Sequence, residues 1–189
     1  MAIQTIMTPA ENSQQVNLRY VLITVVAVFV TWEVHELAHW FTGKAFGYPM
    51  AMTLNTAYSL NGTTPRDAQV ISAAGPLMTI LQAVLLFMLM RGRERAFLYP
   101  FLLTCLYCRL LAALVSIINP NDEARISTYL GIGKFTLPVA VSALLFVVVF
   151  KISRSYRFSS RFNFINVLLI LFLTSAIILC DQFFHLRLI

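Results

Sequence analysis

The chain has 189 residues, of which 59% are hydrophobic and only 12% are charged. Its mean hydropathy of +0.77 is too high for an ordinary soluble domain. The formal net charge is +6, but the basic residues gather at the ends of apolar runs and form no continuous stripe that would suit nucleic acid. Composition therefore argues against a soluble or nucleic-acid-binding protein and predicts one embedded in a lipid bilayer.

Apolar runs that suit a hydrocarbon core of about 30 Å follow one another along the chain. We expect five spans, at residues 20–41, 68–90, 97–118, 136–152 and 164–184. No internal repeat or linker separates them. The sequence thus predicts one membrane-embedded domain over residues 1–189, an all-α multi-pass protein of the cell membrane.

The segment between the first two spans, residues 50–61, alternates with period two. This period predicts extended chain, and Asn61-Gly62 is a turn signal. One interpretation is an interfacial loop whose alternation is accidental. The other is a short strand or hairpin at the membrane surface, with an edge free to pair with an extended peptide. The candidate substrate-binding residues are then Met52, Leu54, Asn55 and Thr56.

The first span contains the sequence His-Glu-Leu-Ala-His at residues 35–39. On a helix, residues four apart lie about 40° from one another, so His35 and His39 can both reach one metal ion. Glu36 then lies close enough to handle the water that attacks a substrate. The pattern predicts a zinc site of the kind that metalloproteases use.

The depth of this cluster also requires an explanation. Titratable side chains are costly inside a span, and His35 lies about 22 Å along the helix from Tyr20, near the far boundary of the hydrocarbon region. A hydrogen-bond network between helices or haem ligation would be the alternative reason for buried histidines. A structural interpretation also needs a reason to keep Glu33 and Glu36 in this span.

A catalytic zinc site usually has a third protein ligand. Odd-numbered spans run in the same direction, so the loop after the third span, residues 119–134, emerges on the same membrane face as the two histidines. This loop contains Asp122 and Glu123. The pair Asp181 and His185, at the end of the fifth span, reaches that face too. Of these candidates the topology favours Asp122.

Arg109 is the basic residue predicted in mid-span. It could orient the acidic ligands or the substrate, although a salt bridge to Glu33 or to Asp181 is the interpretation we favour. Three thiols also fall inside predicted spans, too few for a four-cysteine zinc site, and are interpreted as small buried packing residues. They are Cys105, Cys108 and Cys180.

Three motifs connect the chain to a known family. They are the sequence at 35–39, followed by Gly43 and Gly47, then Ala-Gly-Pro-Leu at 74–77, and Asn-Pro-Asn-Asp at 119–122. Together they resemble the site-2 protease family of intramembrane zinc metalloproteases. The sequence departs from the family pattern at Thr79, near the place of a frequent Asn, and at Glu123, in the place of a Gly, so the chain looks like a nearly minimal, divergent member.

The resemblance implies a role for each matched residue. His35, His39 and Asp122 would hold Zn²⁺, and Glu36 would be the catalytic base. The segment 50–61 would match the family's membrane-associated strands, which are thought to hold the substrate in extended form.

The resemblance also implies the reaction, which is hydrolysis of a peptide bond in or near the transmembrane segment of a partner membrane protein. The alternative is a non-catalytic membrane subunit or binding protein that retains the protease scaffold, with or without the metal. A transporter is a third interpretation, weakened by the lack of repeat symmetry.

Two indications of membrane orientation oppose each other. Of the 14 Lys and Arg residues, eight lie in the N-terminal segment and in the loops after the second and fourth spans, and five lie on the opposite face. An excess of positive charge marks the cytosolic side, which places the N-terminus inside and the zinc site toward the outside. The family resemblance implies instead that the histidine end faces the cytosol.

Overall fold

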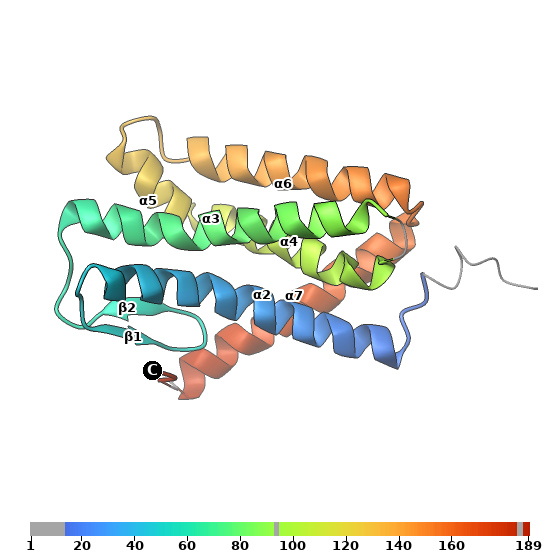
Figure 1. Cartoon of the computed structure of the whole chain (residues 1–189), viewed down its shortest axis with the longest axis horizontal. Helices are drawn as coiled ribbons and strands as arrows, with labels where there is room; N and C mark the ends of the chain where they lie inside the picture. The colour runs from blue at the N-terminus through green and yellow to red at the C-terminus, as the bar shows by residue number, and fades with distance from the viewer. Residues whose placement is uncertain (1–13, 93–94, 185–186) are drawn as a thin grey trace, which may run out of the picture.

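The structure is a computed structural model that describes residues 14–92, 95–184 and 187–189. Within these residues it confirms the predicted fold class, helices of membrane-spanning length with a small hairpin between the first two (Figure 1). Five of the described helices are long and apolar enough to cross a membrane. The elements are α2 (Leu18–Ala45), β1 (Met50–Met52), β2 (Ala57–Ser59), α3 (Pro65–Met90), the 3-10 turn η1 (Ala96–Leu98), α4 (Tyr99–Val115), α5 (Asp122–Tyr129), α6 (Thr136–Ser155) and α7 (Ser160–Phe184).

Polar capping residues set where the long helices begin. The side chain of Asn17 accepts a hydrogen bond from the Tyr20 N–H at the start of α2, and Thr64 caps α3 in the same way. Such caps satisfy N–H groups that have no partner inside the helix. The helices α2 and α3 therefore begin a few residues before the predicted spans 20–41 and 68–90, whereas α4 ends three residues before the predicted end of the span 97–118.

The predicted loop after the third span contains a helix of its own, α5. Asn121 caps this helix by accepting a hydrogen bond from the Asp122 N–H at 3.1 Å, and its own N–H donates to the Ser116 hydroxyl at 3.0 Å. Asp122 is consequently the first residue of a helix rather than part of an irregular loop.

The segment 50–61 forms a hairpin rather than one long strand. β1 and β2 pair antiparallel with Met52 opposite Ala57, and the Thr53 N–H donates to the Thr56 carbonyl at 2.8 Å to close the turn over Leu54 and Asn55. All of β1 is buried. The turn predicted at Asn61-Gly62 follows β2, where Gly62 has a φ of +74°.

The helices pack around α2, α3 and α4. Figure 1 shows α6 covering one side of this group and α7 crossing on the other. Large apolar side chains such as Phe29, Leu81 and Phe172 are exposed on the outward faces, as expected where the surrounding solvent is hydrocarbon. These features are those of a multi-pass membrane protein.

A buried hydrogen bond joins the first and last long helices at the end of the bundle where α2 begins. The Tyr20 hydroxyl donates to the Asn166 side-chain oxygen at 2.6 Å, and the Asn166 amide donates to the Phe162 carbonyl at 2.8 Å. The aromatic ring of Phe162 packs against that of Tyr20, with the ring centroids 5.4 Å apart. A polar contact in this setting fixes the register of α7 against α2.

This bond gives a test of the helix packing. We expect Tyr20→Phe and Asn166→Leu each to lower the free energy of unfolding, with a coupling of about 0.6 kcal/mol, typical of hydrogen bonds between membrane helices. A double-mutant cycle measured by denaturant titration in mixed micelles gives this coupling. Fully additive effects would contradict the assignment.

Candidate metal centre

Two imidazoles and a carboxylate meet in the interior of the bundle. His35 and His39 come from successive turns of α2, and Asp122 comes from the start of α5. The two Nε2 atoms are 3.1 Å apart, and Asp122 Oδ2 lies 3.3 Å from that of His35 and 3.4 Å from that of His39. All three residues are buried, and within the described residues they form a group that could hold a metal ion.

The Nδ1 atom of each imidazole, which faces away from the centre, already has a hydrogen-bond partner. His39 Nδ1 lies 2.6 Å from the Ile71 carbonyl oxygen, which can only accept, so this nitrogen carries the proton. Thr79 uses its own hydroxyl proton to donate to the Gly75 carbonyl at 3.1 Å. It must therefore accept from His35 Nδ1, which lies 3.0 Å away. Both neutral rings thus present an unprotonated Nε2 to the centre.

The acidic member of the group is ionised. The guanidinium of Arg109, whose Nη1 lies 3.9 Å from Asp122 Oδ2, favours the ionised form of this carboxyl. The other oxygen, Oδ1, accepts a hydrogen bond from Arg125 Nη2 at 2.7 Å. The carboxylate is therefore oriented with Oδ2 toward the two rings.

Lone pairs on three atoms then face one another, an arrangement that a cation between them would relieve, and the Arg109 guanidinium already lies 3.4 Å from His35 Nε2. A tetrahedral zinc ion with bonds of about 2.0–2.1 Å separates its ligand atoms by about 3.3 Å, which agrees with the spacings between His35, His39 and Asp122. Two His and one carboxylate are also a common zinc donor set. By charge and by spacing, the residues fit a divalent metal.

Gly75 makes the space in which the rings lie. A Cβ built at this position would overlap His35 Cε1 and the Nε2 atoms of both histidines more closely than real Cβ atoms ever approach. Gly75 belongs to α3, which anchors the two rings from outside through the Ile71 carbonyl and the Thr79 hydroxyl. The Gly-Pro motif thus contributes a gap that side chains from α2 fill.

Arg109 has a different partner from those we favoured. Its Nη1 donates to Glu123 at 3.1 Å and lies 3.9 Å from Asp122, so the predicted salt bridge to Glu33 or Asp181 is wrong. The reason is that α5 folds back against α4 and brings Glu123 level with the guanidinium. Both partners are buried, and such a pair fixes α5 firmly because either charge alone would be costly.

The other candidate third ligands are placed elsewhere. Glu123 is engaged by Arg109. Asp181 accepts hydrogen bonds from the Thr53 hydroxyl and the Leu54 N–H, and His185 lies outside the described residues. Asp122 is therefore the carboxylate that faces the two histidines.

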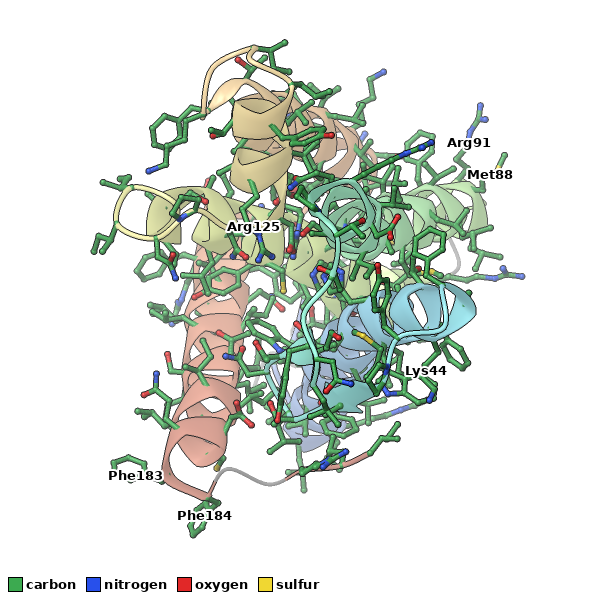
Figure 2. All side chains as sticks on the ribbon, turned by 90° about the vertical axis from the view of Figure 1, so that its left-hand side faces the viewer. Lys44, Met88, Arg91, Arg125, Phe183 and Phe184 are labelled. Atoms are coloured by element: carbon green, nitrogen blue, oxygen red, sulfur yellow. The ribbon has the colours of Figure 1, made fainter. Side chains whose placement is uncertain are left out.

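A cavity of about 720 Å³ opens onto the centre. Its walls include the three metal-centre residues, Glu36, and side chains from the hairpin, α3, α4, α5 and α7. Of the candidate substrate-binding residues, Asn55 and Thr56 line it. Met52 and Leu54 do not. Figure 2 looks onto this end of the bundle, with Arg125 near its middle.

The cysteines take no part in the centre. Cys105 and Cys108 are buried in α4, as predicted, whereas Cys180 is exposed on α7, so its predicted burial is wrong. The error arises because α7 turns this part of its surface outward. All three thiols are free.

Two residues of the centre were not identified from the sequence alone. Arg125 follows Asp122 by three positions, a spacing that places both side chains on one helix face and could have indicated the contact. Gly75 lay in a recognised motif, but its proximity to His35 depends on the packing of α3 on α2, for which no local pattern exists.

The imidazoles of His35 and His39 lie directly against Gly75. Adding one methyl group at this residue is therefore expected to weaken metal binding. We expect Gly75→Ala to lower zinc affinity by at least roughly tenfold, because the rings of His35 and His39 must move. Zinc content of the purified protein by elemental analysis and competition with a chelator measure this. Gly92→Ala is the matched control, since nothing lies within 4 Å of the added Cβ; equal losses in both variants would contradict the prediction.

The contact between Arg125 and Asp122 predicts a second effect on affinity. We expect Arg125→Met to weaken zinc binding by roughly tenfold, as is typical when a residue that orients a ligand is removed, and Arg125→Lys to weaken it less. Chelator competition again gives the affinity. Unchanged affinity in Arg125→Met would show that Asp122 is oriented without this contact.

No protein-family model, no curated protein and no solved structure matches the chain. Within the described residues, the buried group of His35, His39 and Asp122 has a geometry that could hold a metal ion.

Proposed function

We propose that the chain is an intramembrane zinc metalloprotease that hydrolyses a peptide bond in or near the transmembrane segment of a partner protein. The observation that carries this proposal is the convergence of His35, His39 and Asp122 inside a bundle of membrane-length helices. The resemblance of three motifs to the site-2 protease family supports the same assignment.

His35, His39 and Asp122 would hold the metal, with a position left open toward the cavity. When bound, zinc supplies Lewis acidity at the carbonyl under attack. The contribution of the chain is to fix the ligands: the Thr79 hydroxyl and the Ile71 carbonyl orient the rings from outside.

Glu36 is the residue that moves protons in this proposal. It is buried, follows His35 directly on α2, and lines the same cavity as the ligands. A carboxylate in this place can accept a proton from the attacking water and pass it to the leaving nitrogen. The non-catalytic alternative gives no reason for a buried acid beside a metal site.

The hairpin offers a surface for the substrate. A helical transmembrane segment has no accessible peptide bond, so it must unwind locally, and pairing with a strand replaces the hydrogen bonds that it loses. In the antiparallel register Met52 and Ala57 form a pair whose backbone groups point away from the partner strand. The backbone of Ala57 accordingly lies against the Glu36 carboxylate, which brings the outer edge of β2 to the catalytic position.

The test compares wild-type protein with Glu36→Gln on reporter membrane proteins whose transmembrane segments contain Gly or Pro. We expect both proteins to hold zinc at equal stoichiometry and Glu36→Gln to cleave at least roughly 100-fold more slowly, as the loss of a general base predicts. Asp122→Asn is the companion variant that should lose metal as well as activity.

Two results would contradict the proposal. Cleavage at the same rate by wild type and Glu36→Gln would remove Glu36 from the reaction. Stoichiometric zinc without Glu36-dependent cleavage would favour a binding protein or subunit that keeps the scaffold.

A further inference from the structure

The outer edges of the two hairpin strands have different neighbours. On the edge of β1, the Met52 carbonyl accepts from the Leu188 N–H at 2.8 Å, and the Met52 N–H donates to the Ile189 carbonyl at 3.1 Å. On the edge of β2, the backbone of Ala57 faces Glu36 and the cavity. The segment 187–189 thus acts as a third strand that closes the edge remote from the metal centre.

The turn of the hairpin is fixed by α7. Asp181 Oδ2 accepts a hydrogen bond from the Thr53 hydroxyl at 3.1 Å, and its Oδ1 accepts from the Leu54 N–H at 3.1 Å. One carboxylate therefore holds a side chain and a backbone group of the turn together. Bonds to an ionised acceptor are stronger than those between neutral groups.

The last turns of α7 have few buried contacts with the bundle, although Ile177 packs against the hydrophobic core and Ile178 and Gln182 line the cavity. Thr174 is the last buried residue of this helix. Beyond it, Phe183 and Phe184 point outward, as Figure 2 shows. The contacts with the hairpin therefore add to the attachment of this end of α7, and in the same way α7 supports the outer side of the hairpin.

We propose that Asp181 and the segment 187–189 form a clamp that positions the hairpin for the substrate strand. This inference rests on the proposed proteolytic function. A two-stranded hairpin alone is marginally stable, and an open β1 edge would accept a strand on the side away from Glu36. The clamp removes both problems, so that an incoming strand adds only to β2. Asp181 is a positioning residue that touches neither metal nor substrate.

The first experiment measures the clamp without reference to activity. Hydrogen exchange of the full-length protein in nanodiscs is compared among wild type, Asp181→Leu and Asp181→Asn. Leu has nearly the same shape as Asp but accepts no hydrogen bond, whereas Asn keeps an acceptor for the Leu54 N–H. We expect exchange in residues 50–60 to accelerate by roughly tenfold in Asp181→Leu, and far less in Asp181→Asn, on the scale of hydrogen bonds to a charged group.

The second experiment measures cleavage of a reporter in the same proteins. We expect Asp181→Leu to raise KM by roughly tenfold with little change in kcat or zinc content, because the strand-binding edge is loosened while the metal centre is intact. Leu188→Pro should act similarly, since proline removes the N–H that donates to Met52. Leu188→Ala is its control because it keeps that N–H.

Clear results would overturn the clamp. Unchanged exchange and unchanged KM in Asp181→Leu would show that the hairpin holds its position without it. Loss of zinc, or equal falls in kcat and kcat/KM, would assign Asp181 to general folding. Failure of the proposed function is distinguished because it appears as absent Glu36-dependent cleavage in wild type, while the exchange experiment still tests the clamp.

Discussion

The metal centre depends on three ligand atoms whose lone pairs face one another. They are the Nε2 atoms of His35 and His39 and Oδ2 of Asp122, which lie 3.1 to 3.4 Å apart. Neither His35 nor His39 can turn its ring to relieve this arrangement, because each Nδ1 proton is held by α3. Asp122 adds a negative charge whose orientation is fixed by Arg125. A positive charge at the centre, a proton or a metal ion, is what makes this arrangement stable in a medium of low polarity.

The packing of the surrounding helices holds the three ligand atoms close together. α3 approaches α2 closely because Gly75 has no side chain. α5 is held against α4 by the buried pair of Arg109 and Glu123, which sets the height of the neighbouring Asp122. A change in the packing of these helices would therefore move the ligand atoms, and a change at the ligands would disturb the packing.

Much of the centre could be predicted because its determinants are local or topological. The four-residue spacing places His35 and His39 on one helix face, and the shared direction of odd-numbered spans brings Asp122 to the same level. Composition was sufficient for the membrane helices, since a long apolar run has few other uses.

The remaining features depend on contacts between distant parts of the chain. Period-two alternation in residues 50–61 indicated extended structure but continues through Leu54 and Asn55, so it contained no signal for the reversal there. Arg109 pairs with Glu123 because the segment after the third span folds into α5. A short polar segment gives no clear sequence signal for such a helix. The contact of Asp181 with Thr53 joins residues 128 positions apart, and no pattern in the sequence relates them.

The order of the ligands along the chain has a consequence for biogenesis. His35 and His39 enter the bilayer with the first described span, but Asp122 is synthesised only after two more spans have followed. Until then the newly inserted helix carries unpaired imidazoles and acids into lipid, where they are costly. Burial of the polar face of α2 is thus completed by a segment made later, while α6 and α7 have still to be added.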